Sequence, residues 1–280
     1  MPGEYFMPQN LNEAMDVMRS HHPLVLAGGT DVFPTRGRKP IGGDILDITR
    51  IHGLRGIDLR TDGSIRIGAA TTWSDIVRAD LPPAFAALRA AGTEVGSVQI
   101  QNAGTIAGNI CNASPAADGL PPLLALDAEV ELASAAGTRQ MPLSQFVLGV
   151  RSTALLPGEI VTAIHVPNQP THCVSAFEKL GSRKYLVISI TMTAAIIGLD
   201  PGGRINVAKI AVGACSPVAQ RLHQLEADMV GQRPGDLRIS DMHLAGLSPI
   251  SDMRADAAYR AEAVAEQIKR TIAKAVAAHG

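Results

Sequence analysis

The sequence predicts a protein of mixed helices and strands that folds as about two domains. The chain has 280 residues, and a domain typically takes about 150. Apolar residues at helical spacing alternate along the chain with short apolar runs that are typical of strands. Pro167-Asn168-Gln169-Pro170 is the best candidate for a linker between domains. Apolar residues make up 46% of the chain but aromatic residues only 3%, so we expect a sizeable aliphatic core that needs no disulfide or metal.

The first elements surround a glycine turn. Asn10-Leu11-Asn12-Glu13 has the pattern of an N-cap followed by an acid at the third helical position, which predicts a helix over residues 11–20. Pro23 ends this helix, and the apolar run Leu24–Ala27 predicts a buried strand. Gly28-Gly29-Thr30-Asp31 follows the strand directly as a turn.

The next segment has the patterns of β structure and of helix starts. A strand is predicted at residues 45–48, and two more flank Asp62-Gly63, a dipeptide typical of hairpin turns whose central residues both have positive φ. Thr72-Trp73-Ser74-Asp75 predicts a capping box that opens a helix. Pro82-Pro83 breaks that helix, and the Ala- and Leu-rich stretch 84–91 predicts another.

The second half predicts more strands and a long final helix. Strands are expected at residues 128–133 and 158–164. Residues 187–199 and 205–212 flank Asp-Pro-Gly-Gly, which predicts a long antiparallel hairpin. The last helix is expected over residues 255–277.

Charge and cysteine content exclude several classes of protein. The formal net charge is −1, which argues against a basic nucleic-acid face and against a polybasic membrane anchor. Three scattered cysteines without a CxxC lack the signature of a zinc or iron–sulfur site and fit a reducing cytosol. The stretch Met1–Tyr5 has no leader pattern, and the uncharged, mainly apolar run Tyr185–Leu199 is too short to span a membrane. We therefore expect a cytoplasmic protein without an integral membrane segment.

Two loops of small residues are the candidate binding elements. GxGxxG, GxxxxGK[ST], HExxH and GxSxG are all absent. The first loop is Ala27–Asp31, and the second is Gly104–Asn109, inside a stretch (residues 96–119) without Lys, Arg or Glu. Each loop could offer successive backbone N–H groups and a hydroxyl, which is the chemistry needed to hold a pyrophosphate. The alternative interpretation is that both are ordinary tight turns.

Seven motifs in order resemble the flavin-binding medium subunit of the molybdenum hydroxylases, which include aerobic carbon monoxide dehydrogenase and xanthine dehydrogenase. They run almost from end to end of the chain: Phe6–Pro8, Leu26–Asp31, Ile67–Thr72, Gln101–Asn109, Asn112–Asp118, Phe177–Lys184 and Asp252–Arg260. The resemblance implies an α+β fold of the vanillyl-alcohol-oxidase (PCMH) type. Its FAD-binding domain would span residues 1–169, with subdomains of about 1–55 and 56–169, and a smaller α/β flavoprotein domain would span 170–280.

The resemblance also implies which residues bind FAD. The two loops would hold the diphosphate, Asp118 would lie toward the ribityl chain, Ile160 near the flavin and Lys179 close to the ring. The full implied set is Leu26, Ala27, Gly28, Gly29, Thr30, Asp31, Thr105, Ile106, Ala107, Gly108, Asn109, Asp118, Ile160 and Lys179. Ala107 stands where the family usually has glycine, which is tolerable if φ is negative there.

Without the resemblance, single residues have plainer interpretations. Asp118 would be a helix-capping acid and Lys179 a surface lysine. Trp73 is expected to pack in the core, and Tyr185 to fill the second domain rather than approach a flavin ring.

The resemblance implies electron transfer inside a larger enzyme. Noncovalently bound FAD on this chain would accept electrons from [2Fe-2S] clusters of a small partner subunit and pass them to an external acceptor. A large molybdopterin-binding subunit would oxidise the substrate, in a dimer of heterotrimers, and we expect no catalytic side chain and no metal on this chain. Two alternatives stay open: a self-contained flavin-dependent oxidoreductase of the same fold, and a flavin-free scaffold or binding subunit.

Overall fold

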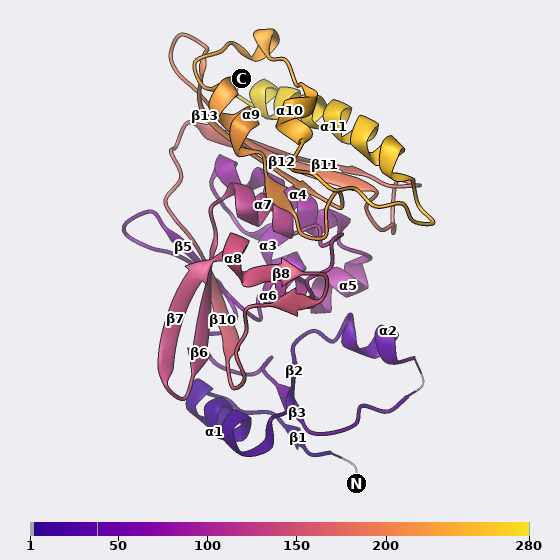
Figure 1. The fold of residues 1–280 in the computed structure, drawn as a ribbon. Helices are drawn as coiled ribbons and strands as arrows, with labels where there is room; N and C mark the ends of the chain where they lie inside the picture. The colour runs from indigo at the N-terminus through magenta and orange to yellow at the C-terminus, as the bar shows by residue number, and fades with distance from the viewer. Residues whose placement is uncertain (1–2, 38, 280) are drawn as a thin grey trace.

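The computed structural model describes residues 3–37 and 39–279. Met1 and Pro2, the start of the stretch inspected for a leader, lie outside the described residues. The chain forms an elongated molecule, with its N-terminal sheet at one end and the C-terminal helix at the other (Figure 1). None of the helices among the described residues combines the length and the hydropathy that a membrane-spanning helix needs.

A small parallel sheet with two helices forms the first part of the chain. β3 (Ile45–Asp47) lies between β1 (Tyr5–Phe6) and β2 (Leu24–Leu26) and pairs parallel with both. The predicted helix is α1 (Leu11–His21), and the Asn10 side chain accepts a hydrogen bond from the Glu13 N–H as expected. The short helix α2 (Val32–Arg36) follows the first glycine loop.

A five-stranded antiparallel sheet and six short helices form the middle part. The strand order is β4 (Ile57–Leu59), β5 (Ile65–Gly68), β10 (Ile160–Val166), β6 (Glu129–Ser134) and β7 (Gly137–Pro142). The helices are α3 (Trp73–Arg78), α4 (Ala86–Glu94), α5 (Val98–Ala103), α6 (Ile106–Asn112), α7 (Leu120–Ala125) and α8 (Leu143–Phe146), together with the 3-10 turn η1 (Pro83–Phe85) and the hairpin of β8 (Val147–Gly149) and β9 (Ser152–Thr153).

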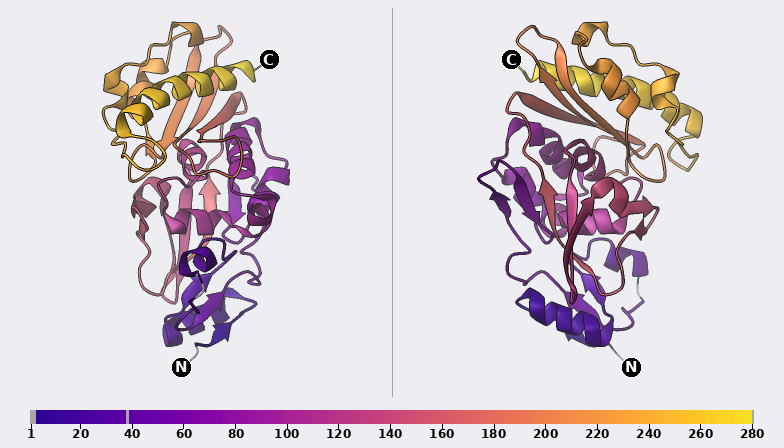
Figure 2. Two further views of the ribbon diagram at one scale, coloured as in Figure 1. Left: turned by 90° about the vertical axis from the view of Figure 1, so that its right-hand side faces the viewer. Right: turned by 60° about the vertical axis from the view of Figure 1, so that its left-hand side comes forward.

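The C-terminal part is a sheet covered by helices on both faces. Its strands, in order, are β11 (Cys173–Leu180), β12 (Thr191–Leu199), β13 (Ile205–Gly213) and β14 (Gln220–Arg221), all antiparallel. The long helix α11 (Ala257–Ala277) crosses one face (Figure 2), and α4 and α7 of the middle part pack on the other. β12 is accordingly buried along almost its whole length. The shorter helices of this part are α9 (His223–Met229), η2 (Pro234–Asp236) and α10 (Asp241–Leu244).

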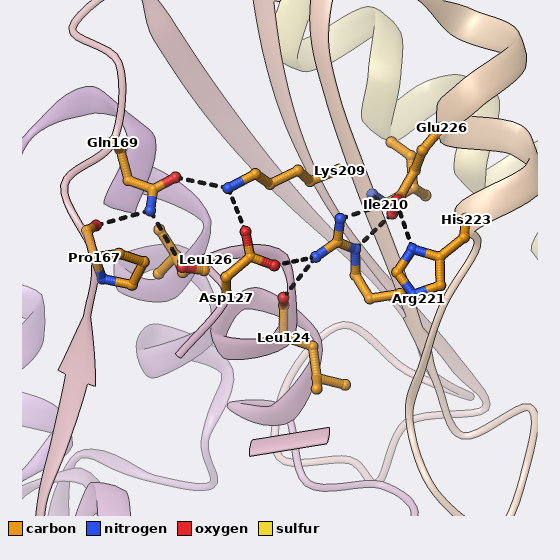
Figure 3. Close-up of polar contacts among 10 residues, drawn as sticks. All are labelled: Leu124, Leu126, Asp127, Pro167, Gln169, Lys209, Ile210, Arg221, His223 and Glu226. Atoms are coloured by element: carbon orange, nitrogen blue, oxygen red, sulfur yellow. Dashed lines mark hydrogen bonds and ion pairs between the residues drawn. The ribbon is translucent and has the colours of Figure 1, made fainter. Parts of the chain in front are cut away.

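A network of ion pairs joins the middle part to the C-terminal sheet (Figure 3). Asp127, in the turn after α7, accepts from Lys209 Nζ and from Arg221 Nη1, each at 2.6 Å. Arg221 also makes a bidentate contact with Glu226, at 2.5 and 2.8 Å. Lys209 donates to the side-chain oxygen of Gln169 at 3.1 Å. These charges fix the orientation of the C-terminal sheet relative to α7.

Several local predictions need correction. β4 and β5 pair as predicted, but Leu59 opposes Ile65, so five residues form the turn, and Gly63 has a positive φ while Asp62 does not. The polar stretch 96–119 contains two short helices, α5 and α6, which were not predicted. β12 begins only at Thr191, and residues 186–188 before it lie in a loop that lines a pocket.

Candidate functional site

A pocket of about 980 Å³ opens between the N-terminal and middle parts. Its lining comes from four segments, residues 24–32, 95–118, 151–161 and 186–188, together with Ile48 and Trp73. Its volume lies at the upper end of the range of ligand sites, about 300–1,000 Å³. The pocket is therefore large enough for a dinucleotide.

The first glycine loop, residues 27–31, forms one wall. It follows β2 directly, and Gly29 takes a φ of +68°, a conformation that favours glycine. A Cβ on Gly28 would lie 1.8 Å from the carbonyl oxygen of Ala103, so this position needs glycine for close contact between the loop and the segment before Gly104. Within the described residues, no protein acceptor takes the backbone N–H groups of residues 28–31. This loop therefore offers the row of free donors that an anion needs.

The second glycine loop behaves differently. Ile106 N–H donates to Thr71 O at 3.0 Å and Ala107 N–H to Ala69 O at 3.3 Å. Gly108 N–H is capped by the hydroxyl of Thr105, and Asn109 N–H donates to Thr105 O, each at 3.0 Å. The prediction that this loop also presents successive free backbone donors is therefore wrong for residues 106–109, because they form the first turn of α6 and their N–H groups have acceptors within the fold.

The second loop does contribute side chains to the pocket. Thr105, Ala107, Gly108 and Asn109 all line it. The Oδ1 atom of Asn109 is buried and has no hydrogen-bond partner within the described residues, and such an orphaned acceptor costs about 1–3 kcal/mol. A ligand with a donor group would remove that cost. Ala107 is helical with a negative φ, so the condition for tolerating its methyl group is met.

Asp118 and Lys179 form a buried ion pair beside the pocket. Lys179 Nζ lies 2.7 Å from Asp118 Oδ2, and both side chains are less than a tenth exposed. Lys179 also donates to Glu94 O at 3.2 Å, and the Ser189 hydroxyl donates to Asp118 Oδ1 at 2.6 Å. Burial raises the pKa of Asp118, and Lys179 opposes that rise. Asp118 is thus no helix cap and Lys179 no surface lysine, so both plainer interpretations are wrong.

Most of the implied FAD-binding residues meet in this one pocket. Those that line it are Ala27, Gly28, Gly29, Thr30, Asp31, Thr105, Ala107, Gly108, Asn109, Asp118 and Ile160. Leu26 and Ile106 instead support it from the core, where each is at most 5% exposed, and Lys179 lies behind Asp118. Trp73 is 1% exposed and packs in the core as predicted.

The sequence analysis missed part of the lining. Leu186–Ile188, from the loop between β11 and β12, line the pocket. Tyr185 in the same loop is 65% exposed, so the prediction that it fills the second domain is wrong. Arg151 lines it too, and its guanidinium donates to Asn112, which donates to Asp31 at 2.9 Å. The apolar run Leu186–Ile188 is the signal that the sequence offers, but two of its three residues fall within the predicted strand 187–199.

The chemistry of the lining fits FAD. Free N–H groups suit a diphosphate, and Ile160 with Leu186–Ile188 gives an apolar surface suited to a flavin ring. Cys111 also lines the pocket, and burial raises the pKa of its thiol to about 12, so it is protonated and unreactive at neutral pH. Within the described chain, no group of His, Cys, Asp and Glu could hold a metal ion.

Two family matches cover nearly the whole chain. Residues 1–169 match the FAD binding domain in molybdopterin dehydrogenase, and residues 175–275 match the CO dehydrogenase flavoprotein C-terminal domain. Both agree with the resemblance drawn from the motifs.

Individual proteins agree with the family matches. The chain is 34% identical to the xanthine dehydrogenase FAD-binding subunit of Escherichia coli O157:H7, over 99% of this chain and 97% of that protein. It is 34% identical to the nicotinate dehydrogenase FAD-subunit of Eubacterium barkeri, over 81% and 79%. The structure of carbon monoxide dehydrogenase from Hydrogenophaga pseudoflava, in a form lacking the Mo-pyranopterin moiety, superposes with a TM-score of 0.87 at 27% identity, over 100% of this chain and 98% of that one.

These matches confirm the predicted α+β FAD-binding fold with its C-terminal flavoprotein domain. The chain belongs to the family of FAD-binding medium subunits of the molybdopterin-dependent hydroxylases, and it is the flavoprotein component of a multi-subunit dehydrogenase.

Proposed function

We propose that FAD binds in the 980 Å³ pocket with its diphosphate against the first glycine loop. The observation that carries this proposal is the row of N–H groups at residues 28–31 without a protein acceptor within the described chain. Thr105 and Asn109 contribute side chains to the cofactor from the facing wall, and Ala107 and Gly108 leave it room. Leu26 and Ile106 support the two loops from the core.

The remaining implied residues take indirect or apolar roles in this proposal. Ile160 packs near the flavin ring, and Asp118 binds toward the ribityl chain. Lys179 acts through Asp118, because it pairs with that carboxylate and does not line the pocket. This placement makes Lys179 a positioning residue rather than a group in contact with the ring.

FAD supplies the ability to collect electrons one at a time and release them in pairs. The residues of this chain bind it, orient it and shield it from water. No side chain of the pocket is assigned to proton transfer, since Cys111 is held protonated and Asp118 is engaged by Lys179 and Ser189.

We place this chain in a complex with two partners. A small subunit with [2Fe-2S] clusters delivers electrons to FAD, and a large molybdopterin-binding subunit oxidises the substrate. The names of the relatives support this arrangement. Two of them describe FAD-binding subunits of dehydrogenases, and the superposed carbon monoxide dehydrogenase is described as lacking the Mo-pyranopterin moiety of a molybdenum cofactor. We expect a dimer of heterotrimers in the cytoplasm, with residues 1–169 and 170–280 of this chain as separate domains.

Purification of the native complex through a tag on this chain tests the proposal. We expect two further chains, iron and molybdenum in the preparation, and one FAD per tagged chain. Acid precipitation should release the flavin into the supernatant, because the bond is noncovalent. Yellow colour in the pellet would contradict noncovalent binding. A lone chain that is reduced by substrate without iron or molybdenum would favour the self-contained flavoenzyme, and a flavin-free complex would favour the scaffold.

A further inference from the structure

One motif of the sequence is not explained by contact with FAD. Asp252–Arg260 leads into helix α11, outside the pocket lining. Arg260 is nonetheless only 2% exposed, although a buried guanidinium is costly unless its charge is compensated. Its Nη2 donates to Asp252 Oδ1 at 2.7 Å, and Asp252 has its pKa lowered to about 2, with hydrogen bonds from Arg254 and Arg260 outweighing burial. The charge of Arg260 is therefore compensated at one end of its guanidinium.

The other end of the guanidinium holds two backbone carbonyls. Nη1 donates to Ile190 O and to Ala214 O. Ala214 has a φ of +61°, which costs a non-glycine residue about 1–2 kcal/mol. Its carbonyl is thus held in a strained turn by a buried charge.

Both carbonyls lead to the same wall of the pocket. Ser189, the neighbour of Ile190, donates to Asp118 at 2.6 Å. The N–H of Ala214 donates to Pro115 O at 2.9 Å. Asp118 lines the pocket, and so do its neighbours in segment 114–118, namely Ser114, Ala116 and Ala117.

We infer that Arg260 is a positioning residue for the cofactor site, because it fixes segment 114–118 through two independent paths. One path runs through Ile190 and Ser189 to Asp118, and the other through Ala214 to Pro115. Lysine cannot replace it, since a single ammonium lacks the planar fork needed to reach Asp252 and two carbonyls together. The inference rests on the proposed placement of FAD against this wall.

The test compares Arg260→Lys with Arg254→Lys in the full chain. Arg254 also pairs with Asp252, at 2.8 Å, but its side chain is 33% exposed and it holds neither carbonyl, so it is a matched control. Hydrogen exchange of the flavin-free chain and titration with FAD are the measurements. For Arg260→Lys we expect faster exchange confined to residues 114–118, 189–190 and 214, and a Kd for FAD raised about tenfold or more. The absorbance spectrum of the bound flavin should shift as well, and Arg254→Lys should leave all three measurements unchanged.

Two outcomes would overturn the inference in distinguishable ways. Unchanged exchange at residues 114–118, or exchange raised over the whole chain, would show that Arg260 has no specific positioning role. Raised exchange at this segment with an unchanged Kd would show that FAD does not use this wall, which contradicts its proposed placement. If Arg260→Lys does not fold, Ser189→Ala removes only the hydrogen bond to Asp118. We then expect faster hydrogen exchange at residues 117–118 and a smaller rise in the Kd for FAD. Unchanged exchange and Kd in Ser189→Ala would contradict the path through Ile190 and Ser189.

Discussion

The two walls of the pocket are built from similar residues but offer a ligand different groups. The first wall, residues 27–31, presents backbone N–H groups that have no acceptor in the described chain. The second wall, residues 105–118, has the N–H groups of residues 106–109 bonded within the fold and presents side chains instead. Glycine content therefore does not by itself reveal which loop binds through its backbone. The first turn of a helix can use its N–H groups in the surrounding fold.

The largest expected effect on cofactor binding comes from the first wall. Gly28→Val places a Cβ 1.8 Å from the Ala103 carbonyl oxygen, so the loop must move away from the segment that precedes the second wall. We expect the Kd for FAD to rise at least a hundredfold, which corresponds to about 2.7 kcal/mol of binding free energy, and the flavin content of the purified chain to fall with it. Gly42→Val is the matched control, because nothing lies within 4 Å of its Cβ position and its φ is not positive. Full flavin content in Gly28→Val would show that the loop is an ordinary turn.

The buried ion pair between Lys179 and Asp118 should contribute more to the unfolding free energy than the exposed pair between Lys274 and Glu178. Lys179→Met leaves Asp118 buried without its cation, which costs about 3–5 kcal/mol of unfolding free energy near pH 8. Lys274→Met, which breaks the exposed pair with Glu178, should cost at most about 1 kcal/mol. Chemical denaturation of both variants measures the difference.

The pH dependence of the Lys179→Met variant has a definite sign. Burial already raises the pKa of Asp118, and loss of the cation raises it further. A carboxyl with a raised folded-state pKa contributes most to stability when it is protonated, and that contribution is lost as pH rises through the raised value. The deficit of the variant should therefore shrink as pH falls toward the ordinary carboxyl range. A deficit that grows on acidification would contradict this assignment.

Sequence reasoning predicted the elements better than it predicted the contacts between them. The helix after Asn10 and the capping box at Thr72 follow from local hydrogen bonds and are present as expected. The pair of Asp118 with Lys179 joins residues 61 positions apart, and only the resemblance placed both at one site. The acceptors of the Ile106 and Ala107 N–H groups are the carbonyls of Thr71 and Ala69, which no local pattern connects to the second loop.

Asn109 should show opposite effects on stability and on binding. Asn109→Leu removes a buried acceptor that has no partner in the described chain, so the flavin-free protein should gain about 1 kcal/mol of unfolding free energy. FAD should bind about tenfold more weakly, because the side chain no longer meets the cofactor. Asn112→Leu is the contrasting variant, since Asn112 bonds to Asp31 and Arg151 and its loss should destabilise the flavin-free chain. If both variants lose unfolding free energy, the side-chain oxygen of Asn109 has a hydrogen-bond partner in the flavin-free protein after all.

The smallest effect is expected at Ala107, where this chain departs from the family's usual glycine. Ala107→Gly restores the family pattern, but residue 107 is helical, 4% exposed and has a negative φ. Glycine in a helix costs about 0.5–1 kcal/mol relative to alanine, so the unfolding free energy should fall by that amount. The Kd for FAD should change less than about twofold, because the N–H of this residue donates to Ala69 O and not to the ligand. If the variant instead binds FAD several-fold more tightly, the result would show that the methyl group of Ala107 crowds the diphosphate. The second wall would then contact the diphosphate as closely as the first wall does.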